Sequence, residues 1–450
     1  MVVRDGSPDA PKVSLQSTPL TRRQVTKGLA LAGTAAFVSA LAPGASRAAA
    51  QGEKVTITYA TPAGGGQPEI DLYDKLISQF EQANPNITVK QQVVPATSDP
   101  EFWQKLQVMA AANEYPDLSY AHYSWFPQAV KVGYLRDLGS DIASSDLKPD
   151  AYFPTTTQQF TSDGKLYALP RETSSIALFY NSTMLSAAKV PSPNDLFAQG
   201  KWTWDEFRSV AKELTDSKTG QWGAIAPVDM PYSLFSVLYS FGGGVLNDDN
   251  TKSMFTSAED IQALTYLQQL VADKTAILPG QAQQLNLFAN GKIGMYASGY
   301  WDIAANIAAA TSFDWDVAPL PKGTVQATRA ASGGYAIPAK AKHPDEAWKL
   351  LQFLSSVDST TYLASLGLII PALKAVAESP DFLQPNAKPA HRKVFVDALA
   401  YGKLDPEIPQ WAEMITIIGN ETDKLWLGQQ TPDETGKSID SQLNQLLQRG

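Results

Sequence analysis

The chain contains no cysteine, although it is 450 residues long. Disulfide bonds, thiol nucleophiles, thiolate zinc sites and iron–sulfur clusters are therefore excluded together, because each of them needs a cysteine sulfur. Histidine is scarce as well, with only three residues, which are His122, His343 and His391. Metal binding and nucleophilic catalysis that depend on imidazole have few residues to draw on, and we expect no metal and no cofactor.

Basic residues are also fewer than acidic ones. Lys and Arg number 36 against 45 Asp and Glu, which gives a formal net charge of −9. Nucleic-acid binding requires a basic surface that neutralises phosphates, and adhesion to anionic lipid depends on the same charge. The balance therefore argues against both partners. Hydrophobic residues at 44% and charged residues at 18% are typical of a globular protein, and the length suggests two or three domains.

Long hydrophobic runs are missing, and residues 1–50 read as an export signal. A basic patch precedes a mildly apolar run at 28–42 and a stretch of small residues; this order is typical of a signal peptide. The run has about fifteen residues, whereas a membrane span needs about 20. The block 21–27, with paired Arg22 and Arg23, resembles the twin-arginine signal; the alternative is an ordinary secretory signal. Because no cysteine is available for a lipid anchor, we expect a soluble periplasmic or secreted protein.

The first part of the mature sequence alternates between strand and helix patterns. Residues 55–60 form a half-alternating apolar run, and residues 69–83 place apolar side chains at helical spacing. Residues 87–94 follow as a second strand. A strand, a helix and a strand within about forty residues predict a βαβ unit. The expected fold class is therefore α/β, with a parallel sheet that helices cover.

Later segments continue this alternation. Thr203 with Glu206 and Ser257 with Asp260 are capping-box pairs, each of which predicts the start of an amphipathic helix. Prolines that suit the first turn of two further helices are Pro344 and Pro432. Further strands are predicted at 165–170, 176–181, 292–297 and 315–321.

Phosphate and dinucleotide motifs are present only as fragments. Gly-Lys-Ser at 436–438 lacks the glycine of a phosphate-binding loop, because Thr431 stands in its place, and the segment reads as helix. The triplets Gly64–Gly66 and Gly242–Gly244 do not complete a dinucleotide fingerprint and are interpreted as turns. The first triplet lies between a strand and a helix, where a loop can border a ligand crevice.

Catalytic motifs are absent too, since the chain has neither a Gly-x-Ser-x-Gly elbow nor a His-Glu-x-x-His helix. The remaining option for an enzyme is a pair of carboxylates, as in glycosidases, with Glu172, Asp229 or Asp302 as candidates. Sequence cannot set the distance between two such groups. A solvated or ion-paired acid is the favoured interpretation of each one.

Several segments together, in order, form a recognisable set. They are FEQANPNITVK (80–90), DGKLYALPRETSSIALFYN (163–181), WTWDEF (202–207), FANGKIGMYASGYWD (288–302), PLPKG (319–323), ASGGYAIP (331–338) and GLIIPAL (367–373). These segments resemble the carbohydrate-type (family 1) extracellular solute-binding proteins, which include the maltose and glycerol-phosphate binding proteins of ATP-driven importers. The resemblance extends over residues 53–450.

The resemblance implies a two-lobed periplasmic-binding-protein fold of the class II type, in which hinge closure traps ligand in a cleft between the lobes. Lobe 1 would comprise residues 51–169 and 331–370, and lobe 2 residues 170–330 and 371–450. The implied crossings between the lobes lie near Leu169–Arg171, Ala331–Gly334 and Ile370–Pro371.

The resemblance and the expected loop positions also suggest ligand contacts. Aromatic rings suit the C–H faces of a sugar, and polar side chains suit its hydroxyls. Trp301 matches an aromatic residue that the family uses against the ligand, and the other candidates lie at crossings or at strand ends. The full set of expected ligand-binding residues is Tyr59, Glu69, Trp125, Arg171, Glu172, Asp229, Trp301, Gly333 and Tyr335.

The sequence therefore predicts a monomeric, non-enzymatic substrate-binding component of an ATP-binding-cassette (ABC) importer, which delivers a carbohydrate to a membrane permease. A secreted glycosidase with a carboxylate pair remains an alternative, as does a ligand sensor or scavenger of the same fold. Arg171 could meet a phosphate or a carboxylate, so a neutral sugar and an acidic or phosphorylated derivative both remain open.

Overall fold

A computed structural model describes residues 53–449, apart from residues 63, 65, 285 and 385. The predicted signal peptide lies outside the described residues. Within the described part of the chain, no helix combines the length and the apolar character that crossing a membrane would require.

The described strands form one large mixed sheet and a small hairpin of β4 and β5. In chain order the strands are β1 Val55–Thr61, β2 Ile87–Val93, β3 Leu118–His122, β4 Thr161–Ser162, β5 Lys165–Leu166, β6 Ala168–Asn181, β7 Trp222–Ile225, β8 Ala276–Ile277, β9 Ile293–Gly299, β10 Trp315–Ala318, β11 Thr328–Ala336, β12 Ile370–Pro371 and β13 Gly402–Leu404.

The helices account for most of the remaining residues. They are α1 Gln67–Ala83, α2 Asp99–Ala111, α3 Phe126–Lys131, α4 Gly139–Ala143, α5 Pro154–Gln159, α6 Ser182–Ala188, α7 Pro193–Ala198, α8 Trp204–Leu214, α9 Tyr232–Ser240, α10 Ala258–Ala272, α11 Pro279–Gln284, α12 Asp302–Ala309, α13 Pro344–Leu354, α14 Val357–Ala364, α15 Lys374–Ala377, α16 Pro380–Leu383, α17 Val394–Asp397, α18 Trp411–Trp426 and α19 Pro432–Leu447, with 3₁₀ turns at Pro149–Ala151 and Ala398–Tyr401.

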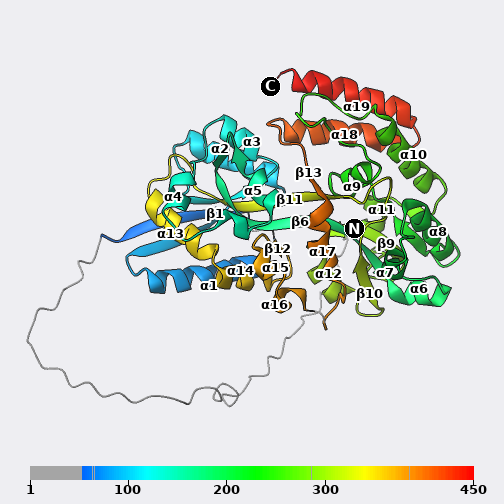
Figure 1. The fold of residues 1–450 in the computed structure, drawn as a ribbon, viewed down its shortest axis with the longest axis horizontal. Helices are drawn as coiled ribbons and strands as arrows, with labels where there is room; N and C mark the ends of the chain where they lie inside the picture. The colour runs from blue at the N-terminus through cyan, green and yellow to red at the C-terminus, as the bar shows by residue number, and fades with distance from the viewer. Residues whose placement is uncertain (1–52, 63, 65, 285, 385, 450) are drawn as a thin grey trace, which may run out of the picture. The chain divides into compact units, whose positions relative to one another are not determined.

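The large sheet consists of two parallel parts that antiparallel strands join. Its order is β2-β1-β3-β11-β6-β9-β7-β8, with β10 and β12 beside β6 and β13 beside β11. Strands β2, β1 and β3 are parallel, and so are β9, β7 and β8. The contacts of β3 with β11, β11 with β6 and β6 with β9 are antiparallel. Figure 1 shows β6 and β11 running between two groups of helices, with α1, α2 and α13 at one end and α8 and α9 at the other.

One strand is longer than the sequence pattern predicts. The segments 165–170 and 176–181 read as separate strands because the polar residues 171–175 interrupt the apolar pattern. In the structure β5 ends at Leu166, and β6 continues from Ala168 to Asn181 through the polar segment. Pairing with β11 on one side and with β12 and β9 on the other supplies backbone hydrogen bonds along this strand, so side-chain hydrophobicity is not needed to keep it extended.

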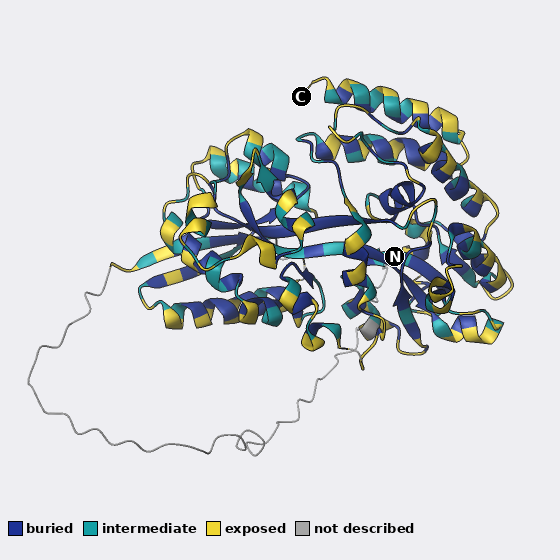
Figure 2. Ribbon diagram, in the orientation of Figure 1, coloured by how far each residue is buried: buried dark blue, intermediate teal, exposed yellow. Residues whose placement is uncertain are grey.

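Alternating side chains of β6 enter two different cores. Ile176, Leu178 and Tyr180 pack in a cluster with residues of α8, α9, α10 and α18. Ala177 and Phe179 pack in another cluster on the opposite face of the strand. This alternation follows from the two-residue period of an extended chain. Figure 2 shows the buried strands enclosed by helices whose outer faces are exposed, which confirms the predicted α/β class.

The helix starts largely agree with the sequence. Pro344 and Pro432 occupy the first turns of α13 and α19. The side chains of Thr203 and Ser257 each accept the predicted hydrogen bond from the backbone of the residue three positions on. A capping box with both hydrogen bonds forms instead at the start of α19, where Glu434 provides the return contact.

The glycines at 242–244 make room for a buried acid. A Cβ atom on Gly243 would lie 2.0 Å from Oδ1 of Asp260. The same carboxylate oxygen accepts a hydrogen bond of 3.1 Å from the backbone N–H of Gly244. Asp260 is fully buried, and this burial raises the pKa of its carboxyl group to about 8.

We predict that Asp260→Asn stabilises the protein progressively relative to the native chain as pH rises. In the unfolded chain the carboxyl group titrates near pH 4. Between roughly pH 4 and 8 folding therefore takes up a proton, so this group's stabilisation is fully present below pH 4 and lost toward pH 8, with a limiting slope of about 1.4 kcal/mol per pH unit. Urea unfolding at several pH values measures the difference.

The control is Asp433→Asn, which makes the same change in the first turn of α19 at an exposed position. Because this side chain is not buried, the variant should not show the steep rise in relative stability expected of Asp260→Asn. A parallel pH response of the two variants would contradict the assignment to Asp260.

Candidate functional site

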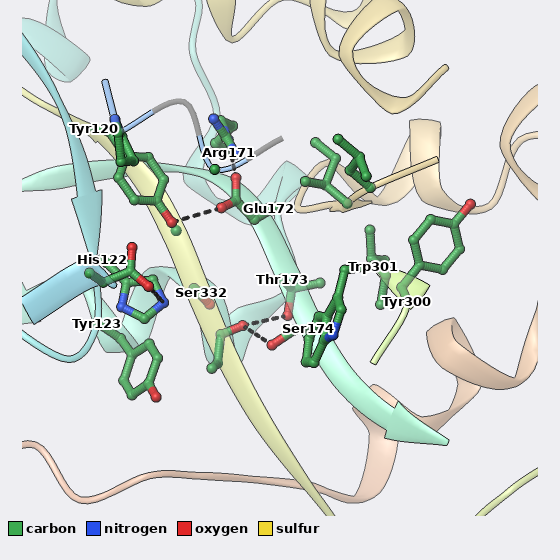
Figure 3. A pocket seen from close by; sticks show the side chains of 18 of the residues that line it. Tyr120, His122, Tyr123, Arg171, Glu172, Thr173, Ser174, Tyr300, Trp301 and Ser332 are labelled. Atoms are coloured by element: carbon green, nitrogen blue, oxygen red, sulfur yellow. Dashed lines mark hydrogen bonds and ion pairs between the residues drawn. The ribbon is translucent and has the colours of Figure 1, made fainter. Parts of the chain in front are cut away.

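A cavity of about 430 Å³ lies where β3, β6 and β11 pass the loops after β1 and β9 (Figure 3). Its wall also includes the start of α9 and the segment leading into β12. Both charged and aromatic side chains line the cavity. The ionisable and aromatic residues in the wall are Glu69, Asp99, Tyr120, His122, Tyr123, Arg171, Glu172, Tyr232, Tyr300, Trp301 and Arg329.

Arg171 is the centre of one charged cluster. Its guanidinium pairs with Glu172 through Nε and lies 3.1 Å from Oε1 of Glu69 through Nη1. Nη1 also donates to the hydroxyl of Tyr73 at 2.8 Å. Burial opposes the charge of Arg171, but Glu172, Tyr73 and Glu69 hold its pKa well above the usual range. The α1 helix and the β6 strand are thereby linked through a fixed cation.

Glu172 has a second partner on β3. The hydroxyl of Tyr120 donates to its Oε1 at 3.1 Å, as Figure 3 shows. Burial raises the pKa of Glu172, and the neighbouring Arg171 offsets part of that increase. Gly333 faces this contact from β11, and a Cβ atom there would lie 2.1 Å from Oε1 of Glu172 and 2.6 Å from the Tyr120 hydroxyl. The register of β11 against β6 shifts between Gly333 and Gly334.

Arg329 forms a second buried charged cluster. It pairs with Asp405 at 2.7 Å and donates to the hydroxyl of Tyr123. The rings of Tyr123 and Tyr232 each lie 5.1 Å from the centre of the guanidinium. Arg329 is only 2% exposed. Burial opposes its charge, but Asp405 and Tyr123 raise its pKa above the usual range.

Asp99 and His122 lie on a third side of the cavity. Nε2 of His122 is 3.5 Å from Oδ2 of Asp99, while Nδ1 lies 2.8 Å from the hydroxyl of Ser124. Burial and the two arginines lower the pKa of His122 well below its ordinary value. Burial raises the pKa of Asp99 to about 6. At neutral pH Asp99 is therefore a carboxylate beside a neutral imidazole.

Trp301 contributes an aromatic ring at the end of β9. Figure 3 shows its indole projecting toward Thr173 and Ser174 on β6, while the ring of Tyr300 projects away from them. The ring of Trp301 lies 5.1 Å from that of Tyr232. Gly299 makes this placement possible, because a Cβ atom there would lie 2.0 Å from the indole.

The structure brings five of the nine predicted residues into this cavity. Glu69, Arg171, Glu172, Trp301 and Gly333 all line it. They come from α1, β6, β11 and the turn after β9, so the tertiary fold gathers residues that are far apart in sequence.

The other four predicted residues are placed elsewhere. Tyr59 and Tyr335 point into the core beside Tyr73, where the two hydroxyls of Tyr73 and Tyr335 are 3.0 Å apart. Trp125 stacks on Trp103 with ring centres 5.0 Å apart. Asp229 borders a different cavity beside α18. The alternation of β1 and β11 turns both tyrosines inward, and the start of α3 turns Trp125 toward α2.

Sequence reasoning missed several residues that line the cavity. Asp99 begins α2, Tyr120 is on β3, Tyr232 begins α9 and Arg329 is the second residue of the buried strand β11. Tyr120 and His122 alternate on one strand, which was a usable signal. Arg329 gave no comparable signal, because its partner Asp405 is distant in sequence.

The charged clusters do not form a metal centre. Among the described residues, no group of three or more His, Asp or Glu side chains is arranged to hold a metal ion. What the arrangement can do chemically is hold a polar molecule. The hydroxyl of Ser332 in the cavity wall is buried and has no hydrogen-bond partner among the described residues.

We predict that Gly333→Ala lowers the free energy of unfolding by about 1–3 kcal/mol, as overpacking does, because Cβ would displace the Glu172 carboxylate. The control is Gly419→Ala in α18, where a Cβ atom meets nothing within 4 Å. That change should stabilise the helix by roughly 0.5–1 kcal/mol. Chemical denaturation measures both, and unchanged stability of Gly333→Ala would contradict the packing described above.

Comparison with known proteins now identifies the family. Residues 75–390 match the family of bacterial extracellular solute-binding proteins. A binding-protein relative from Brucella abortus (strain 2308) is 26% identical over 430 residues, covering 93% of this chain and 98% of the relative.

Two solved structures extend the match to the fold. An ABC substrate-binding protein of Listeria monocytogenes in complex with cycloalternan is 27% identical, with a TM-score of 0.77 over 88% of this chain and 100% of the other. The GacH receptor of Streptomyces glaucescens, solved unliganded and with acarbose, is 25% identical, with a TM-score of 0.75 over 87% and 98% of the two chains. The predicted two-lobed α/β fold is confirmed, and the chain belongs to the bacterial extracellular solute-binding proteins.

Proposed function

We propose that this protein captures a carbohydrate in the 430 Å³ cavity and delivers it to the permease of an ABC importer. The observation that carries the proposal is the mixture of aromatic rings, hydroxyls and ion-paired charges in one cavity wall. The relatives solved with cycloalternan and with acarbose support this ligand class. Membership of the extracellular family supports a periplasmic or secreted location.

The lining of the cavity suits a sugar for a physical reason. A sugar ring has apolar C–H faces, which pack on aromatic rings, and hydroxyls that need hydrogen-bond partners once water is removed. Trp301 and Tyr232 offer the first kind of surface. The buried hydroxyl of Ser332 has no partner among the described residues, and a ligand hydroxyl would satisfy it. Glu69, Arg171, Glu172 and Trp301 are the proposed ligand contacts.

The balance of charge favours a neutral sugar over an acidic or phosphorylated one. Arg171 is already paired with Glu69 and Glu172, and Arg329 with Asp405. No arginine or lysine without a carboxylate partner lines the cavity among the described residues. An anionic ligand would therefore lose hydration without gaining an unpaired cation.

Ligand capture would be coupled to closure of two lobes. We assign residues 51–169 and 331–370 to lobe 1, and residues 170–330 and 371–450 to lobe 2. Strands β6, β11 and β12 lie at the proposed crossings. Separate hydrophobic clusters around β1 and around β9 support two cores. Near the third crossing the clusters exchange residues, since Ala372, Leu373 and Val376 pack with the first and Ala364 and Ile370 with the second. Hinge motion at the crossings would enclose the ligand.

Binding without turnover fits the arrangement of carboxylates. Glu69 and Glu172 are tied to the same arginine, so neither is free to transfer a proton. Asp229 and Asp302, the other candidates for a glycosidase, are not among the described residues that line the cavity.

A ligand screen of the mature chain by thermal shift tests the function. The panel contains neutral mono- and oligosaccharides, sugar acids, polyols and glycerol phosphodiesters. We expect a neutral sugar to raise the unfolding temperature, with a stabilisation of about 2.7 kcal/mol at a hundredfold excess over Kd. Chromatography of the best ligand should show no breakdown. Hydrolysis would favour the glycosidase, and a preference for anionic ligands would contradict the charge argument.

Trp301→Ala tests the aromatic contact. We expect this variant to lose at least tenfold in affinity for the sugar that the screen identifies, because the ring face is removed, and Trp301→Phe to lose less. The unliganded unfolding temperature of both variants should stay close to that of the native chain, because Trp301 is only half-buried. Unchanged affinity of Trp301→Ala in calorimetric titration would contradict the proposed contact.

A further inference from the structure

Arg392 is a buried arginine that does not belong to the wall of the cavity. It lies in the turn before α17 and is only 4% exposed. Among the described residues no Asp or Glu forms an ion pair with it, whereas Arg171 and Arg329 are both paired. A buried cation without a counter-charge is costly. The contacts that Arg392 does make must therefore offset that cost.

The guanidinium of Arg392 binds two backbone carbonyl groups. Nη1 donates to the carbonyl oxygen of Phe382 at 3.2 Å, and Nη2 donates to that of Lys388 at 3.0 Å. The first oxygen belongs to α16, and the second belongs to the connection between α16 and α17. The rigid fork of a guanidinium holds two acceptors in defined positions, which the flexible ammonium of a lysine does less well. Arg392 therefore fixes α16 relative to the start of α17.

The side chains of Arg392, Phe382 and Phe395, here called the Tyr300 seat, surround the ring of Tyr300. This ring stacks on that of Phe382 with 5.1 Å between the ring centres, and it meets the ring of Phe395 edge-on at 5.4 Å. The Cζ atom of Arg392 lies 6.0 Å from the centre of the Tyr300 ring. Burial raises the pKa of the Tyr300 hydroxyl to about 12, and the charge of Arg392 limits that increase. Tyr300 is only 1% exposed, so its ring has little freedom to leave the seat.

The position of Tyr300 constrains the direction of the next side chain, Trp301. The two residues lie between β9 and α12. Figure 3 shows the indole of Trp301 projecting toward Thr173 and Ser174, while the ring of Tyr300 projects away from them. One planar peptide unit joins the two residues. A backbone rotation that released Tyr300 from its seat would therefore also redirect the indole of Trp301.

We propose that Arg392 is a positioning residue for the ligand site, because it holds the Tyr300 seat together and thereby keeps the indole of Trp301 directed into the 430 Å³ cavity. Arg392 is not among the residues that line the cavity, so it acts on a ligand only through Tyr300 and Trp301. The inference rests on the proposed function for its effect on affinity. The direction of Trp301 can be measured without any ligand.

Fluorine NMR of the unliganded mature chain, labelled with 5-fluorotryptophan, tests the direction of Trp301. Trp301→Phe and Trp103→Phe assign the resonances of these two tryptophans by their loss. We expect Arg392→Met to shift the Trp301 resonance by more than its line width or to broaden it, while the Trp103 resonance stays in place. Arg392→Lys keeps the charge and should produce a smaller shift in the same direction. An unchanged Trp301 resonance in both variants would overturn the proposal.

A double-mutant cycle tests whether Arg392 affects binding through Trp301. The probes are maltotriose, cellotriose, xylotriose and arabinotriose, and the cycle uses the one that the native chain binds most tightly in calorimetric titration. We expect Arg392→Met to weaken binding roughly fivefold or more in the native background and less than about twofold in Trp301→Ala, because residues that act through one another are not additive. Arg392→Lys, with a smaller loss, replaces Arg392→Met in the cycle if the latter does not fold.

The control is Arg136→Met, which removes an arginine that pairs with Asp141 and does not line the cavity. It should change neither the Trp301 resonance nor the affinity. Equal losses of Arg392→Met in the two backgrounds would overturn the action through Trp301 and leave sugar binding intact. If the native chain bound none of the probes, the proposed function would fail, whereas the NMR experiment would still decide whether Arg392 positions Trp301.

Discussion

The antiparallel pairing of β6 with β11 is the constraint on which the rest of the structure depends. The two strands join a parallel part built on β1 to another built on β7 and β9. Because backbone hydrogen bonds saturate the strands, the polar segment Arg171–Ser175 can run through the interior without breaking the sheet. Side chains of these central strands consequently meet loops from both parallel parts, and the cavity forms where they meet.

Charged side chains that line the cavity from these buried strands need partners of opposite charge. A buried charge is costly unless it is paired and hydrogen-bonded. Arg171 on β6 is held by two carboxylates and Tyr73, and Arg329 on β11 by Asp405 and Tyr123. The pairing fixes the side chains before a ligand arrives, which reduces the ordering cost of binding. It also neutralises the arginines, and it is for this reason that the site suits an uncharged ligand.

The sequence by itself determined the α/β class, the strand at β1 and the helices that start at Pro344 and Pro432. It also singled out Arg171, Glu172 and Trp301, which supply charged and aromatic side chains to the cavity wall. These follow from local periodicity, capping chemistry and a recognisable order of segments. Only the tertiary structure decided that two predicted strands are one, since pairing with β11 overrides the polar interruption. It also decided which aromatics line the cavity and which are core, and that Asp405 partners Arg329, because contacts between distant residues leave no local pattern in the sequence.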